Sequence, residues 1–150
     1  MDTLLSETLA AIEAERKDHR FSTSFDLAKR IAEAWGENNL ADRLNTAIPQ
    51  NYPWDIVASL FDILSWTCIE NGINDNGAAI SRTIEGWLQE NDDTRRIQIA
   101  LNLEVYPFID QKEMEMTLDE VANRHPQFRD RCKDLIRQRQ QESERARSLS

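Results

Sequence analysis

Acidic side chains and a tryptophan recur at helical spacing over residues 54–71, and their types suit the binding of a basic partner. The stripe consists of Asp55, Ser59, Asp62, Trp66 and Glu70, which are separated by 4, 3, 4 and 4 positions, and Asp75 follows it. This spacing places the five residues on one side of a helix. An aromatic side chain surrounded by carboxylates is typical of a protein-binding surface, where the ring anchors and the charges steer.

The same stripe has a second interpretation. The opposite side of this helix is apolar and is expected to face the core; it carries Val57, Leu60, Phe61, Leu64 and Cys68. A helix this apolar is often covered on most sides. The acidic stripe can then be a solvated face on which Trp66 leans against a neighbouring helix, and both interpretations stay open.

No pattern of catalytic, metal-binding or nucleotide-binding residues is present. The two histidines, His19 and His125, belong to no known ligand motif, and CxxC, HExxH and glycine-rich phosphate loops are absent from the sequence. Cys68 and Cys132 lie among apolar neighbours, as reduced core cysteines do. We therefore predict no catalytic residue, no cofactor and no metal, and a protein that is not an enzyme. A small enzyme with an unrecognised site is kept as a further alternative.

The net charge of −9 is unevenly distributed. Residues 1–123 carry 10 basic and 23 acidic side chains, whereas residues 124–150 carry 8 basic and 4 acidic ones. An acidic body repels nucleic acid and attracts basic surfaces. Residues 117–147 resemble the parts of a DNA-binding helix-turn-helix, with Arg129, Arg131 and Lys133 on the second helix. The proline in the turn and the acidic body make nucleic acid an unfavourable partner.

The N-terminal residues and the apolar segments bear on location. The start, MDTLLSETLAAIEAE, carries acids where a signal peptide has basic residues. No apolar run reaches the roughly 18 residues of a membrane span. We expect a cytoplasmic protein without a membrane partner.

Hydrophobic periodicity predicts helices throughout the chain. They are expected over residues 3–18, 23–35, 38–47, 53–71, 77–90 and 117–125, with a last helix after Pro126, and Trp35 and Trp87 are expected in the core. Thr23 with Asp26, and Thr117 with Glu120, match capping boxes, and residues 109–116 are expected to be a connector or an extra turn. The fold predicted is all-α, a single compact domain of seven to eight helices over residues 1–138. Its form is an irregular bundle or a short α-solenoid-like stack of helix pairs. Residues 139–150 are polar and are expected to be a frayed or disordered extension.

The segment IQIALNLEV, residues 97–105, fits two kinds of secondary structure. Strict alternation of apolar residues predicts a strand, but a lone strand in a helical chain leaves its backbone groups unpaired. We predict a helix that is apolar on two faces, capped by Asp92 or Asp93 and ended or bent by Pro107.

These features together favour a small, acidic, cytosolic protein-binding module. By analogy of composition we expect an inhibitor or immunity-type protein that neutralises a basic partner, such as a nuclease toxin. The alternative from a different class is a nucleic-acid-binding regulator that uses residues 117–147. The sequence also leaves open whether the protein forms a homodimer.

Overall fold

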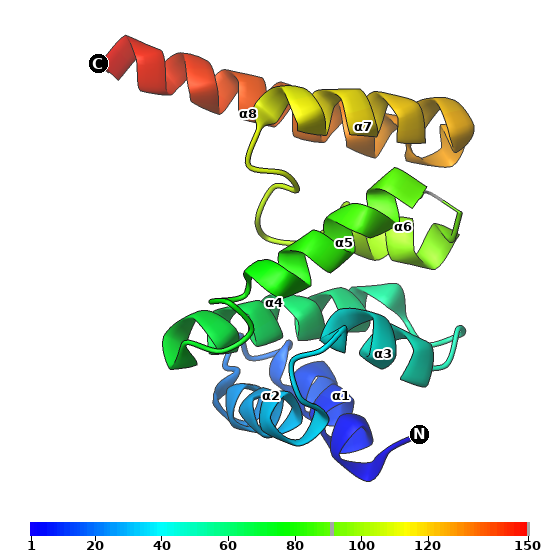
Figure 1. The fold of residues 1–150 in the computed structure, drawn as a ribbon, viewed down its shortest axis with the longest axis vertical. Helices are drawn as coiled ribbons and strands as arrows, with labels where there is room; N and C mark the ends of the chain where they lie inside the picture. Colours follow the sequence, from blue (N-terminus) through cyan, green and yellow to red (C-terminus); the bar gives the residue numbers. More distant parts are fainter. Residues whose placement is uncertain (91, 150) are drawn as a thin grey trace. The chain divides into compact units, whose positions relative to one another are not determined.

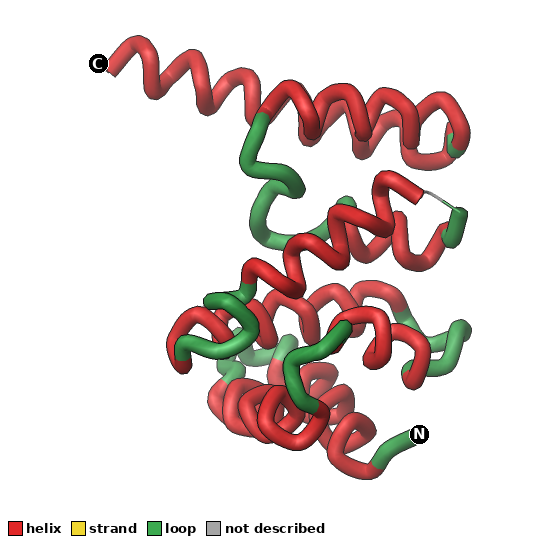
Figure 2. Tube along the Cα trace, in the orientation of Figure 1, coloured by secondary structure: helices red, strands yellow, loops and turns green. Residues whose placement is uncertain are grey.

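The structure is a computed structural model that describes residues 1–90 and 92–149. Every regular element in these residues is helical (Figures 1 and 2). The elements are α1 (Thr3–Glu15), α2 (Ser22–Trp35), α3 (Leu40–Ala47), α4 (Trp54–Asn71), α5 (Ala78–Glu90), α6 (Thr94–Ala100), α7 (Gln111–Arg124), the 3₁₀ turn η1 (Pro126–Phe128) and α8 (Arg129–Leu149). The prediction of an all-α fold with seven to eight helices is confirmed.

Contacts divide the chain into two compact units, Met1–Ile84 and Glu85–Ser150. The division falls inside α5, so this helix contributes residues to both units. Each unit is described by itself below. The single domain predicted over residues 1–138 stays a prediction.

In the first unit, α1 and α2 lie side by side and α4 packs against both of them (Figure 1). The core consists of apolar side chains that share one face of each helix and have no exposed surface: Leu5, Leu9, Ile12, Ala28, Ile31, Val57, Leu60, Phe61 and Leu64. The predicted apolar stripes of α1 and α4 therefore face the core, whereas the stripe expected on α2 does so fully only at Ile31, because Leu27 is half-buried. Trp35 is an exception, because it is only half-buried at the end of α2, where the guanidinium of Arg43 lies 5.9 Å from its ring centroid.

The N-terminus of α2 is capped by a residue from the preceding helix, and not by the predicted capping box of Thr23 and Asp26. The carboxylate of Glu15 accepts hydrogen bonds from the backbone N–H of Ser24 at 2.7 Å, from the Ser24 hydroxyl at 2.6 Å and from the backbone N–H of Thr23 at 3.3 Å. Phe21, at the N-cap position, has no side-chain acceptor to offer. The first N–H groups of the helix therefore donate to the Glu15 carboxylate. Its negative charge also interacts favourably with the positive end of the helix dipole.

Replacing Glu15 with alanine is expected to destabilise the protein by about 1–2 kcal/mol, the usual range for loss of an N-cap. The matched control is Glu13→Ala, because Glu13 is exposed on the same helix and forms no cap. Urea denaturation of the two variants measures the difference. Equal stability of both variants would show that Glu15 does not hold α2.

In the second unit, α7 and α8 form a hairpin that reverses through η1, and the two helices lie side by side (Figure 1). Helix α7 begins earlier than predicted, because Asp110 and not Thr117 is its N-cap: the Asp110 carboxylate accepts from the backbone N–H of Glu113 at 3.3 Å. Residues 111–116, predicted as a connector or an extra turn, are part of this helix. The buried Met114 extends its apolar face by one turn toward the N-terminus and stabilises the longer helix.

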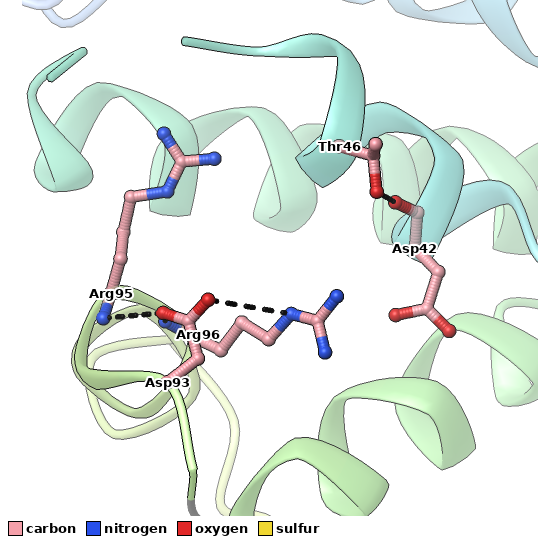
Figure 3. A network of polar contacts seen from close by, with 5 residues as sticks. All are labelled: Asp42, Thr46, Asp93, Arg95 and Arg96. Atoms are coloured by element: carbon pink, nitrogen blue, oxygen red, sulfur yellow. Dashed lines mark hydrogen bonds and ion pairs between the residues drawn. The ribbon is translucent and has the colours of Figure 1, made fainter. Parts of the chain in front are cut away.

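The segment 97–105 is helical only in its first part. Asp93 caps α6 as predicted, accepting from the backbone N–H groups of Arg95 at 2.9 Å and Arg96 at 3.2 Å. Figure 3 shows the bond to Arg95 and the ion pair between the Asp93 carboxylate and Arg96 Nε at 4.0 Å. The helix ends at Ala100, and residues 101–105 form turns, so the prediction of helix through 105 was wrong. Ile97, Ile99 and Leu101 are all buried, which explains the apolar alternation without a strand.

Figure 3 also shows a contact inside α3 of the first unit, where the Thr46 hydroxyl donates to the carbonyl oxygen of Asp42 at 2.9 Å. Helix α3 is short, and its buried residues are Leu40, Ala41, Leu44 and Asn45. The polar side of α3 therefore faces outward, and the apolar side joins the core of the first unit.

The polar extension predicted from residue 139 is helical in the structure and continues α8 to Leu149. Its first turns are held to α7 by side-chain hydrogen bonds, from Gln140 Nε2 to Glu115 at 2.7 Å and from the Ser143 hydroxyl to Gln111 at 2.7 Å. Two polar pairs thus connect the start of this extension to α7, and the expectation that its end frays stays a prediction. In the described part of the chain, no helix combines the length and the apolar character that crossing a membrane requires.

Candidate functional site

Helix α4 presents the predicted stripe on a rigid base. The chain enters the helix at Pro53 and leaves it at Gly72, which has φ +64 and whose backbone N–H donates to the carbonyl of Cys68. The apolar side is fixed in the core, since Val57, Leu60 and Cys68 have no exposed surface. The stripe lies on the opposite side of the helix.

The C-terminal half of this stripe is exposed. Trp66 is 47% exposed and Ile69 is 51% exposed, and Glu70 beside them is exposed as well. Residues three apart on a helix are surface neighbours, so the indole and the Ile69 side chain form one apolar area. We call Trp66, Ile69, Glu70 and Asp75 the α4 patch. Ile69 was missing from the predicted site, although its spacing of three from Trp66 could have indicated it.

The N-terminal half of the stripe is engaged in contacts within the first unit. Asp55 forms an ion pair with Arg16 at 3.0 Å, and the Ser59 hydroxyl donates to the Asp55 carbonyl at 3.1 Å. Burial raises the pKa of the Asp55 carboxyl, but the hydrogen bond and charge of Arg16 outweigh this effect, so the pKa lies below its ordinary value. Acidification through this lowered pKa therefore weakens the native state. Asp62 is half-buried. These three residues are less available to a partner than the α4 patch.

The turn after α4, which carries Asp75, has an unusual backbone. Asn74, Asp75, Asn76 and Gly77 all have positive φ, between +54° and +84°. Asparagine, aspartate and glycine are the residues that tolerate this region. A Cβ atom at Gly77 would lie 3.3 Å from the carbonyl oxygen of Ser65 and 3.6 Å from Ile69 Cγ1. The turn is therefore packed directly against the last turns of α4, and Figure 2 shows this loop in green between α4 and α5.

Replacing Gly77 with alanine is expected to destabilise the protein by about 1–3 kcal/mol, because a Cβ is disfavoured at φ +84° and meets Ser65 at close range. Gly86→Ala is the matched control. Gly86 lies within α5, where an added Cβ would meet no described atom within 4 Å, and the substitution should gain roughly 0.5–1 kcal/mol from helix propensity. Thermal denaturation should show a lower melting temperature for Gly77→Ala and a higher one for Gly86→Ala. Equal shifts of the melting temperature in the two variants would contradict the close approach of turn and helix.

The α4 patch lies in a stretch of the sequence whose charged residues are all acidic. No lysine, arginine or histidine occurs between Arg43 and Arg82, and this interval contains Asp55, Asp62, Glu70 and Asp75. The nearest cation to the patch in sequence is Arg82, which lies 3.4 Å from Asp75 with both side chains mostly exposed. Exposed pairs of this kind contribute little and exchange readily with other partners. The patch thus combines an exposed apolar pair with the carboxylates of Glu70 and Asp75, of which Asp75 is paired with Arg82.

The remaining predicted features carry less chemistry. Burial raises the pKa of the Cys68 and Cys132 thiols to about 11, so neither is a reactive thiolate at neutral pH. Within residues 1–90 and 92–149, no three histidine, cysteine, aspartate or glutamate side chains are grouped so that they could hold a metal ion. Arg131, expected on a DNA-reading face, donates from Nε to the carbonyl of Leu101 at 3.0 Å, whereas Arg129 and Lys133 are exposed.

Comparison with family models, curated protein sequences and solved structures finds no match to this chain.

Proposed function

We propose that the first unit is a protein-binding module that recognises a basic protein surface through the α4 patch. The observation that carries the proposal is the exposure of Trp66 and Ile69, side by side on a helix whose other face is fixed in the core. Tryptophan is prominent among residues that dominate binding energy at protein interfaces. An apolar pair at the centre of a surface is typical of such an interface.

The charge of the partner follows from the border of the patch. Glu70 follows Ile69 on the same helix and Asp75 lies in the turn after it, and no cationic residue lies between positions 44 and 81. Complementary charges speed association and exclude partners of like charge. A partner with lysines or arginines around an apolar or aromatic side chain therefore fits best. The narrower form of the proposal is an inhibitor or immunity-type role, in which the module occupies a basic functional surface such as that of a nuclease toxin.

Selection of a displayed peptide library on the intact protein tests this proposal. We expect the enriched peptides to carry a net positive charge and at least one large apolar residue. Their affinity should fall at least about tenfold with Trp66→Ala, in the range of interface hot spots, whereas Glu70→Lys should mainly slow association.

The matched control is Trp54→Ala, because Trp54 is 38% exposed at the other end of α4. It should leave the affinity of the selected peptides within about twofold, as non-hot-spot surface residues do. Enrichment of acidic peptides, or binding that Trp66→Ala leaves intact, would disprove the assignment of the α4 patch.

A further inference from the structure

A groove with a volume of about 500 Å³ lies in the second unit, between α8 and the loop that joins α6 to α7. Residues of its wall that are half-buried or exposed include Leu103, Val105, Tyr106, Arg131, Gln138 and Glu142. The volume lies within the range of about 300–1,000 Å³ that is common among ligand-binding sites. The groove therefore has room for a ligand.

Hydrogen bonds between the loop and the helix hold the walls of the groove in place. Arg131 Nε donates to the carbonyl of Leu101 at 3.0 Å, and the Tyr106 hydroxyl donates to Glu142 Oε1 at 2.9 Å. Burial, followed by the hydrogen bond and the charge of Glu142, raises the pKa of Tyr106, so the phenol keeps its proton at neutral pH. The two bonds tie the loop to α8, and a groove formed in advance lowers the ordering cost of binding.

Opposite charges mark the two ends of the groove. Arg131 and Glu142 are the first and last α8 residues of the wall, about three helical turns and roughly 16 Å apart along the helix axis. The Nη groups of Arg131 and the Oε2 atom of Glu142 form no hydrogen bond or ion pair within the part of the chain that the structure describes. A guanidinium fork binds a carboxylate through parallel hydrogen bonds, and a carboxylate binds an ammonium or guanidinium group. One end thus suits an acidic group and the other a basic group.

The loop adds exposed apolar surface to the groove. Val105 is 62% exposed and Leu103 is half-buried. An apolar side chain of a ligand would remove this surface from water and stabilise a complex. Glu104 is a second exposed carboxylate in the wall, which therefore has one cationic and two anionic residues. A ligand with charges of only one sign would be repelled by part of this wall.

We propose that this groove binds an extended, dipolar peptide segment of a partner protein. An acidic residue of the segment pairs with Arg131, and a basic residue pairs with Glu142. The apolar residues between them cover Leu103 and Val105. At about 3.3 Å per residue, five residues span the roughly 16 Å between the ends. Gln138 lies between the two ends, and its amide can both donate to and accept from a peptide backbone.

The charges of the wall place the two ends of the peptide but allow either chain direction. Selection on the intact protein therefore uses two libraries of end-blocked pentapeptides, Asp-Xaa-Xaa-Xaa-Lys and Lys-Xaa-Xaa-Xaa-Asp, with apolar residues at Xaa. We expect a tightest binder with a Kd below about 1 mM that shifts the NMR signals of the Val105 backbone amide and the Gln138 side-chain amide. Replacing its Asp with Asn, or its Lys with Gln, should weaken binding at least about tenfold, as expected for loss of a charge-assisted hydrogen bond.

Two variants and one control locate the binding site. Gln138→Trp fills the groove and should weaken binding at least about tenfold, whereas Gln141→Trp, at an exposed position of the same helix outside the wall, should change it less than about twofold. Glu142→Gln keeps an acceptor for the Tyr106 hydroxyl but loses the charge, so this variant should bind the Lys peptide and its Gln analogue equally.

The proposal is independent of the α4 patch, so Trp66→Ala should leave the affinity of the selected pentapeptide unchanged. Absence of any binder below about 1 mM would overturn the proposal. So would equal affinity of the unmodified protein for the Lys peptide and its Gln analogue, or equal effects of Gln138→Trp and Gln141→Trp.

Discussion

Replacing Arg139 with alanine is expected to lower the free energy of unfolding by about 2–3 kcal/mol, because one guanidinium holds three carbonyl oxygens in the second unit. Nη1 donates to Phe108 at 2.7 Å and to Pro107 at 3.2 Å, and Nη2 donates to Ile109 at 2.6 Å. The guanidinium also lies 5.6 Å from the ring centroid of Tyr106. The loop that it holds contains Phe108 at φ +64, a conformation that a residue with a Cβ keeps only when its surroundings impose it.

Arg137→Ala is the matched control for this prediction. Arg137 lies on the same helix, is largely exposed, and pairs with Asp134 three residues away, so its loss should change stability by less than about 0.5 kcal/mol. Arg139→Lys should remain destabilised, because an ammonium group cannot reach three carbonyls in fork geometry. Urea denaturation gives the energies, and hydrogen exchange should rise at residues 108–109 in the Arg139 variants. Unchanged exchange there would show that the loop does not depend on Arg139.

Replacing Trp87 with alanine is expected to cost about 3–5 kcal/mol, the range for truncation of a buried aromatic side chain. Trp87 is 3% exposed, and Arg96 lies 5.7 Å from its ring centroid. Trp66→Ala should cost far less, because 47% of Trp66 is already exposed in the native protein. Trp35→Ala should fall between the two.

This tryptophan series also separates stability from binding. If the proposed function is correct, Trp66→Ala removes partner affinity while the melting temperature hardly changes. Trp87→Ala lowers the melting temperature but keeps partner affinity, measured at temperatures where the variant is folded. Thermal denaturation and acrylamide quenching of tryptophan fluorescence check the order of burial. A melting temperature for Trp87→Ala within a degree or two of the unmodified protein would contradict the burial of this residue.

Local sequence determined which segments are helices and which side of each helix is apolar. Spacings of three and four residues follow from helix geometry alone, so Leu5, Leu9 and Ile12, or Val57, Leu60 and Leu64, could be assigned to the core without knowledge of their neighbours. The end of α4 at Gly72 and the cap of α6 at Asp93 could likewise be predicted, because each depends only on residues that are close in the sequence.

The errors lie where a distant residue supplies the missing interaction. Glu15 caps α2 in place of the local Thr23, and Arg131 bonds to the carbonyl of Leu101, where the predicted helix stops short. Gln140 and Ser143, in the polar extension, likewise bond to α7, while the expectation that this extension frays stays a prediction. A local sequence pattern indicates which secondary structure a segment prefers. Only the tertiary structure shows which hydrogen-bond donors and acceptors from distant segments lie close together.

In the candidate site, too, some features follow from local sequence and others depend on distant residues. The spacing of the α4 stripe predicted that Trp66 and Glu70 share one face, since a helix has a fixed period. It could not predict that Asp55 would pair with Arg16, 39 residues away, or that the turn at Gly77 would pack on Ile69. Exposure and proximity are properties of packing, so tertiary structure alone reduced the stripe to the α4 patch.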